Sequence, residues 1–272
     1  MSVSTQGEAA GISYGTLATS VALFVFLVML VFLGNRWAAR FPQLPDFSSY
    51  QQVDEMKAAF IANLTPIVKH HNQKILGERK RLEKIHKVLM HNERPSYSEL
   101  KWITQLADRY AVEWDEGNQL AVTQALLAKV DIVPVQLAVV QAAKESSWGR
   151  SRYAVQVNNI FGEWCYRKGC GIIPKERPKG ARHEVRKFSS VSDSTRSYMH
   201  NLNSHHNYSS LRQLRQELRT KGRAIEGSDL VDGLLFYSER RQQYVDEIRS
   251  MIKQYSYFLR QQARAGRVIK GA

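Results

Sequence analysis

The fold is decided by residues 135–149, which read VQLAVVQAAKESSWG. Residues 135–143 are apolar on nearly every side of a helix, and this pattern predicts a buried central helix. Pro134 stands directly before them, and proline suits the first turn of a helix. Glu145 follows the apolar run and precedes Trp148. A carboxylate is therefore expected at the C-terminal end of a buried helix, beside an indole.

Such a position favours a general acid. Burial disfavours the charged carboxylate, and the negative end of the helix dipole does the same, so both raise the pKa of Glu145. A general acid at neutral pH needs a raised pKa of this kind. The alternative is a structural carboxylate that pairs with Lys144 or Arg150 at the helix end.

Composition limits the class of partner. The chain has 272 residues, with 39 Lys and Arg against 25 Asp and Glu, a net charge of +14. That length holds one catalytic-sized domain with appendages. The charge favours anionic polymers, or is simply a solvated basic surface. No nucleic-acid-binding signature accompanies it, so we expect no nucleic acid partner.

Residues 17–33 carry no charge and, extended to residues 11–35, are long enough to cross a bilayer. We predict a transmembrane anchor within residues 1–40. A cleaved signal peptide is the alternative, but it needs a positive segment before the apolar run, which is missing here. Arg36 and Arg40 place their end of the span on the cytoplasmic side under the positive-inside rule, which conflicts with an exported domain.

Residues 41–118 are predicted to be a linker and a helical stalk that packs on the catalytic domain. Apolar residues recur at helical spacing from Val53 to His91, which indicates one or two amphipathic helices bent near Pro66. Ser96 and Glu99 form a capping box that starts another helix. Four histidines on the charged first segment are expected on the surface: His70, His71, His86 and His91.

The run AAKESSWGRS at residues 142–151, followed by NNIFG at residues 158–162, resembles the A-x-x-E-S-x-W-G-x-S and N-N-x-F-G signatures of bacterial peptidoglycan N-acetylglucosaminidases, glycoside hydrolase family 73. Segments 130–134, 188–190, 201–203 and 208–210 resemble the Bax-like branch of that family. The resemblance implies a mainly α fold, a lysozyme-like α+β domain at residues 119–259 with a small β-lobe beside a glycan groove. A basic tail at residues 260–272 would follow. Glu145 matches the glutamate that protonates the glycosidic oxygen.

The resemblance also implies which residues hold the substrate. Phe236-Tyr237-Ser238 is similar to a turn that brings a tyrosine to the groove, so Tyr237 is a catalytic candidate, with a core tyrosine as the alternative. The implied substrate-binding residues are Trp148, Asn159, Phe161, Gly162, Tyr198 and Tyr208.

A second catalytic carboxylate has no motif of its own. The candidates are Glu163, Glu176 and Glu184. Retaining glycosidases hold their two carboxylates about 5–5.5 Å apart and inverting ones about 6.5–9.5 Å apart. Assistance by the N-acetyl group of the sugar is a further possibility that the sequence leaves open.

Cys165 and Cys170 lie five residues apart, with Gly169 between them. A turn there would place them opposite each other across a hairpin and suit a disulfide in an oxidising compartment, with two free thiols as the alternative. No second cysteine pair or nearby histidine completes a metal site, so we expect no metal and no cofactor. Glycines and prolines punctuate residues 165–187 and predict the β-lobe.

The expected partners are peptidoglycan glycan strands and, through the N-terminal helix, a membrane. The expected location is the bacterial inner membrane, single-pass, with the catalytic domain in the periplasm. Two other functions compete with endo-β-N-acetylglucosaminidase activity. A lytic transglycosylase also uses one glutamate, although its G-L-M-Q element is missing here. A catalytically silent peptidoglycan-binding scaffold is the other.

Overall fold

The computed structural model describes residues 23–26, 29, 41 and 43–270, and its compact unit begins at Gln43. The predicted anchor at residues 17–33 lies for the most part outside the described residues. None of the helices described is both long enough and apolar enough to cross a membrane. The elements in chain order are η1 (Phe47–Ser49), α2 (Val53–Met90), α3 (Tyr97–Arg109), α4 (Gln119–Lys129), α5 (Val135–Glu145), α6 (Arg152–Val157), β1 (Trp164–Cys165), β2 (Gly171–Ile172), β3 (Glu184–Arg186), α7 (Val191–Ser204), η2 (His206–Tyr208), α8 (Ser209–Thr220), α9 (Gly227–Leu230), η3 (Val231–Leu234) and α10 (Gln242–Lys270).

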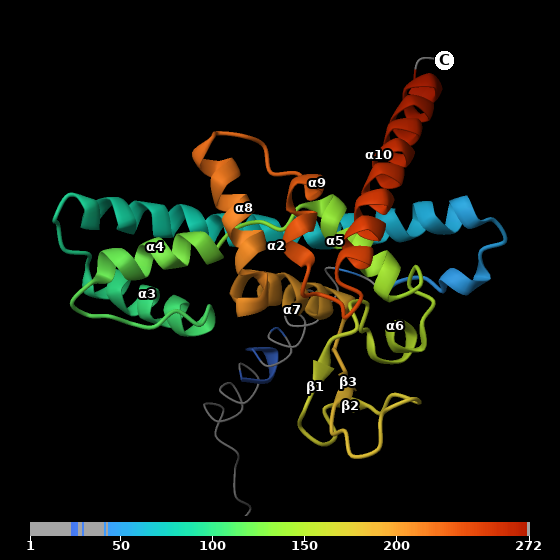
Figure 1. Ribbon diagram of the computed structural model, residues 1–272, viewed down its shortest axis with the longest axis horizontal. Helices are drawn as coiled ribbons and strands as arrows, with labels where there is room; N and C mark the ends of the chain where they lie inside the picture. Colours follow the sequence, from blue (N-terminus) through green and yellow to red (C-terminus); the bar gives the residue numbers. More distant parts are fainter. Residues whose placement is uncertain (1–22, 27–28, 30–40, 42, 271–272) are drawn as a thin grey trace, which may run out of the picture. The chain divides into compact units, whose positions relative to one another are not determined.

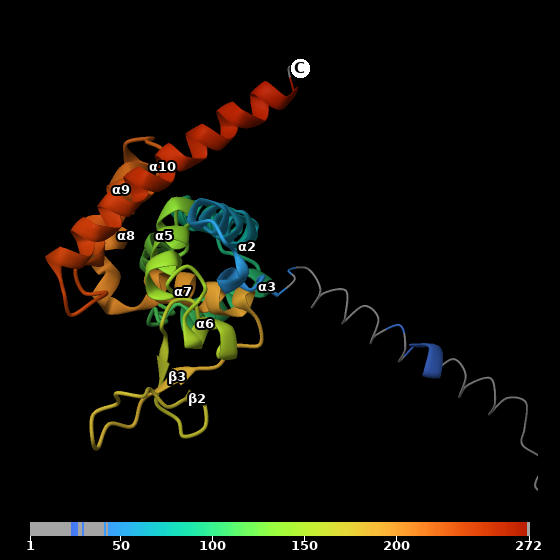
Figure 2. The same cartoon turned by 90° about the vertical axis from the view of Figure 1, so that its right-hand side faces the viewer.

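Helix α5 is the centre of the core, as its apolar sequence predicts. Every residue from Leu137 to Ala143 is buried. The helix packs against α2 on one side and against α10 and α9 on others, as Figures 1 and 2 show. A helix that is apolar all round is stable only when neighbours cover it in this way.

The N-terminal segment forms one continuous helix, α2, with Pro66 inside it. The alternative of two helices is therefore wrong. Helix α3 begins at the predicted capping box, in which Ser96 and Glu99 each bond the other's backbone N–H. The expectation that His71 lies on the surface is also wrong: it is 7% exposed and its Nε2 lies 3.0 Å from the backbone oxygen of Ser192.

Two buried polar side chains tie α2 and α8 to the segment between α4 and α5. Asn72 on α2 donates to the Val133 carbonyl at 2.7 Å and accepts from the Val133 N–H at 3.0 Å. Arg215 on α8, 1% exposed, donates to the carbonyls of Ile132 and Ala128. These bonds satisfy backbone groups that no helix pairs, so they fix the point where α5 begins.

The three strands form a small sheet that projects from the helical body (Figures 1 and 2), which confirms a mainly helical chain with a small β-lobe. The strand order is β1-β3-β2, and both neighbours run antiparallel to β3. Cys165 and Cys170 form the predicted disulfide. The predicted hairpin between them is wrong, because β3 lies between β1 and β2. The bridge instead joins β1 to the residue directly before β2.

Candidate active site

Glu145 is the last residue of α5, and the backbone turns sharply after it. Ser147, Trp148 and Gly149 all have positive φ values, of 51°, 60° and 80°. Glycine is required at the third position, because a Cβ there would lie 2.5 Å from the ring of Phe47. The turn ends the helix at Glu145, so its side chain lies at the helix end rather than within the core.

A chain of hydrogen bonds holds the carboxylate of Glu145. The Tyr198 hydroxyl donates to Gln141 Oε1 at 2.6 Å, and Gln141 Nε2 donates to the Tyr244 hydroxyl oxygen at 2.9 Å. The Tyr244 hydroxyl then donates to Glu145 Oε1 at 2.8 Å. Each donor fixes the direction of the next, so Oε1 accepts and Oε2 is left to carry a proton.

The sequence left open a pairing of Glu145 with Lys144 or Arg150. Lys144 Nζ lies 2.5 Å from Glu247 Oε2, and Arg150 Nε donates to the Ser147 carbonyl. Within the part of the chain that the structure describes, no cation forms an ion pair with Glu145. The structure therefore does not support the alternative of a paired, structural carboxylate.

Burial raises the pKa of Glu145 above its usual value. The Tyr244 hydrogen bond and the charges of Lys144 and Arg240 act in the opposite direction, but they do not offset it. Burial thus gives the direction that the sequence predicted. A raised pKa is the direction that a general acid requires.

A cluster of four tyrosines lies beside Glu145. Tyr237 stacks on Tyr244 with ring centroids 5.3 Å apart, and Tyr198 and Tyr208 complete the cluster at 6.4 Å and 6.0 Å from Tyr237. Burial raises the pKa of each, that of Tyr208 to about 12. They remain protonated donors with aromatic faces.

The N-N-x-F-G segment joins this cluster. The ring of Phe161 stacks on Tyr198 with centroids 3.8 Å apart and an angle of 4° between planes. The Phe161 carbonyl accepts from the Tyr237 hydroxyl at 3.4 Å. Phe161, Tyr198, Tyr208 and Tyr237, all sequence candidates, are therefore brought together around Glu145.

Glu163 is the candidate second carboxylate that lies nearest this cluster. Its Oε2 accepts from Ser197 Oγ at 2.7 Å, and its buried Oε1 has no hydrogen-bond partner in the described part of the chain. Burial raises the pKa of Glu163 to about 7, although the Ser197 bond and the Arg186 charge act to lower it. The charges of Glu163 and Glu145 both raise the pKa of Tyr208, so Tyr208 lies within electrostatic range of both carboxylates.

The other two carboxylates have different surroundings. Glu184 accepts from the backbone N–H groups of Gly169 and Gly171, both at 2.9 Å, and these bonds lower its pKa. It holds the disulfide-bridged loop. Glu176 is exposed in the loop between β2 and β3. Neither is placed with Glu145 by any contact of the described residues.

Three more candidates from the sequence, Trp148, Asn159 and Gly162, support the fold near the site. The Trp148 indole packs edge-on against Phe60 at 5.6 Å rather than on the tyrosine cluster. Asn159 is buried and bonds the backbone of Glu163 and Arg186, which anchors the β-lobe. Gly162 has a φ of 70°, a left-handed turn that leads the chain from Phe161 into β1.

Comparison with known proteins decides the family. A family model described as mannosyl-glycoprotein endo-beta-N-acetylglucosaminidase matches residues 120–257. Protein bax of Escherichia coli strain K12 is 31% identical over 217 residues, which are 80% of this chain and 76% of that protein. The chain belongs to this glucosaminidase family. No solved structure gives a significant match.

Membership indicates a glycosidase-type enzyme that acts on glycans. In this glucosaminidase domain, Glu145 and the tyrosines lie within residues 120–257, whereas α2 and α3 lie before the matched region. The N-terminal helices are therefore an addition to the family domain, and Asn72 joins them to it.

Sequence reasoning missed three residues of the glucosaminidase site: Gln141, Tyr244 and Ser197. Gln141 had a usable signal, because it is polar within an apolar helix and lies one turn before Glu145, on the same face. Tyr244 is one apolar residue among several on the last helix, and Ser197 is one serine among many. Only the tertiary structure brings these two to the carboxylates.

Proposed function

We propose that this glucosaminidase cleaves the β-1,4 bond after N-acetylglucosamine in peptidoglycan. The observation that carries the proposal is Glu145 itself, a half-buried carboxylate of raised pKa whose hydrogen-bond partner is an uncharged tyrosine. The fold we propose for residues 119–259 is a lysozyme-like domain, with the glycan bound between the helices and the β-lobe.

In the proposed reaction, Glu145 gives the proton on Oε2 to the glycosidic oxygen as the bond breaks. Tyr244 keeps Oε1 oriented, so the proton-bearing oxygen points where the substrate lies. The rings of Tyr237, Tyr208 and Phe161 and the hydroxyls of the two tyrosines would hold sugar rings, as the aromatic cluster beside Glu145 supports. We propose Trp148 as a more distant contact.

Glu163 is our candidate for the second carboxylate. It is supported by its unpartnered Oε1 and by its effect on Tyr208, which it shares with Glu145. When ionised it would stabilise the positive charge that develops on the sugar ring. Glu176 is exposed and Glu184 holds a loop, so neither is as well placed.

We also propose a periplasmic domain anchored in the inner membrane by residues 1–40. The disulfide between Cys165 and Cys170 supports an oxidising compartment. The uncharged run at residues 17–33 supports the anchor.

The test is hydrolysis of purified peptidoglycan by the full chain and by Glu145→Gln, which is nearly isosteric but cannot donate the proton. Loss of a general acid costs on the order of 10²–10⁴ in rate. Glu176→Gln is the matched control and should hydrolyse like wild type. New reducing ends at N-acetylglucosamine support the proposal, whereas anhydro-muramic ends indicate a transglycosylase. A folded Glu145→Gln protein that keeps more than half of the activity would remove Glu145 from the role.

A further inference from the structure

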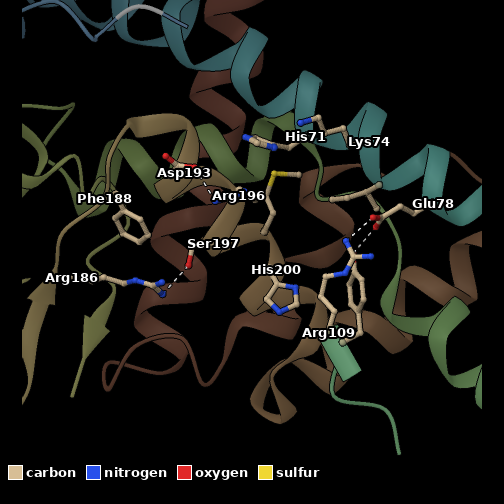
Figure 3. A pocket seen from close by; sticks show the side chains of 13 residues that line it. His71, Lys74, Glu78, Arg109, Arg186, Phe188, Asp193, Arg196, Ser197 and His200 are labelled. Atoms are coloured by element: carbon tan, nitrogen blue, oxygen red, sulfur yellow. Dashed lines mark hydrogen bonds and ion pairs between the residues drawn. The ribbon is translucent and has the colours of Figure 1, made fainter. Parts of the chain in front are cut away.

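A hollow that Ser197 lines lies between α7 and the N-terminal helices. Its volume is about 480 Å³. One wall comes from α2 and α3, with His71, Lys74 and Arg109, and the other from β3 and α7, with Arg186 and His200 (Figure 3). Helices α2 and α3 precede the matched family region, so the family domain alone would not enclose this pocket.

The pocket has an excess of positive charge. Four cations line it, Lys74, Arg109, Arg186 and Arg196, against two carboxylates. Each carboxylate already has an arginine partner: Glu78 pairs with Arg109 at 2.6 Å and Asp193 with Arg196 at 2.8 Å (Figure 3).

Lys74 and Arg186 remain without a carboxylate among the residues that the structure describes. Arg186 donates only weakly to Ser197 Oγ, at 3.4 Å, and its guanidinium lies 5.0 Å from the ring of Phe188. Neither cation forms an ion pair within the described residues, although the charge of Arg186 acts on Glu163, so the hollow they face attracts an anionic ligand.

The cations around the pocket help to lower the pKa values of His71 and His200. Burial lowers the pKa of His71 to about 4, and the charges of Lys74 and Arg196 add to the effect. Burial also lowers the pKa of His200, and Arg109 acts in the same direction. In both rings these effects disfavour the charged form, so the rings offer hydrogen bonds rather than a further cation.

The size and lining indicate more than a single small anion. The hollow also contains the apolar side chains of Ile75, Phe188 and Met199 between the cations. A ligand with carboxylates on a partly apolar frame, such as a short acidic peptide, matches both features. Ser197 lines the pocket and also bonds Glu163, so one residue separates this hollow from the proposed glycan site.

We infer that the pocket binds the carboxylates of the short acidic peptides that peptidoglycan strands carry, with Lys74 and Arg186 as their charge partners. This rests on the proposed function and narrows its substrate to glycan that bears peptides. The N-terminal helices thus add substrate recognition to the family domain.

The test uses the full chain, purified in mild detergent, and isothermal titration calorimetry with a synthetic peptide that bears two free carboxylates. Lys74→Glu should weaken binding at least about tenfold, because an attraction becomes a repulsion. Lys74→Gln should weaken it less. Lys80→Glu is the matched control: it makes the same charge change on the exposed face of α2, outside the pocket, and should bind like wild type.

Two further probes identify the ligand chemistry. The same peptide with both carboxylates amidated should bind at least tenfold more weakly, and inorganic phosphate should bind far more weakly than the acidic peptide. Equal binding of the amidated peptide, or phosphate binding as tight as that of the acidic peptide, would overturn the assignment. So would equal loss in Lys74→Glu and Lys80→Glu.

Turnover separates this inference from the proposed function. Lys74→Glu should raise KM on peptide-bearing peptidoglycan and leave the cleavage of peptide-free N-acetylglucosamine oligomers unchanged. Loss on both substrates would mean that Lys74 supports the fold and not the peptide. If wild type cleaves neither substrate, the proposed hydrolase activity fails, while peptide binding is still decided by the calorimetry.

Discussion

The pKa of Glu163 makes the stability of the chain depend on pH in a predictable direction. In the folded chain the pKa is about 7, against 4.5 for an ordinary glutamate. Between these values the folded state binds more protons than the unfolded state, so the free energy of unfolding falls as pH rises. The cost is absent below about pH 4.5 and complete above about pH 7.

The size of the effect follows from the same two values. A tenfold change in an equilibrium constant is worth about 1.4 kcal/mol, so the folded chain loses about 3 kcal/mol when Glu163 ionises. Glu163→Gln removes this cost, because the amide does not titrate. Its own NH₂ group would lie where Oε1 lacks a partner, which costs about 1–3 kcal/mol at every pH.

The quantity to measure is therefore the free energy of unfolding of Glu163→Gln minus that of wild type, compared between two pH values. Denaturant unfolding of the full chain at pH 4 and at pH 8 gives the stability of Glu163→Gln relative to wild type at each pH. We expect the variant to gain about 3 kcal/mol relative to wild type between the two. Glu176→Gln, the same change at an exposed carboxylate, should gain nothing. A change below about 1 kcal/mol for Glu163→Gln would refute the argument that burial raises this pKa.

Four other predictions concern the pKa of Glu145, the disulfide and the N-terminal segment. Tyr244→Phe removes a hydrogen bond that lowers the pKa of Glu145, so the alkaline limb of the pH profile of kcat/KM should move to higher pH, with about a fivefold loss from poorer orientation. Glu247→Gln frees two cations that lower the same pKa, so that limb should move to lower pH. Replacing Cys165 and Cys170 by serine should leave the chain folded, since so short a loop is worth less than about 3 kcal/mol, but should weaken glycan binding in a sedimentation assay. The full-length product should keep its N-terminus and stay with membranes in high salt, whereas a product that begins near residue 38 would indicate a cleaved signal peptide.

The sequence predicted the parts of this fold that depend on neighbouring residues. The buried helix that ends at Glu145 is visible because its apolar run is continuous. The capping box at Ser96 and the disulfide between Cys165 and Cys170 depend on residues three and five positions apart. The resemblance to the glucosaminidases, carried by two short motifs, also pointed to Glu145.

Features that depend on distant residues were not predictable. Gln141 and Tyr244 are 103 positions apart, and no local pattern indicates that they bond. The sequence offered Glu163 and Glu184 as equivalent carboxylates. Glu163 has one buried oxygen without a hydrogen-bond partner among the described residues, whereas Glu184 accepts two backbone N–H bonds, a difference that local sequence does not indicate.

The state of Glu145 depends on a balance that no single residue sets. Burial raises the pKa of Glu145, while Tyr244, Lys144 and Arg240 act to lower it. Glu247 pairs with both Lys144 and Arg240, so it neutralises the two cations that would otherwise stabilise ionised Glu145 most strongly. Glu247 thus acts on Glu145 through these two cations, and it lies one turn after Tyr244 on the same face of α10. A single helix supplies both the hydroxyl that orients the acid and the carboxylate that pairs with the two nearby cations, and the opposite directions expected for Tyr244→Phe and Glu247→Gln follow from this division of roles.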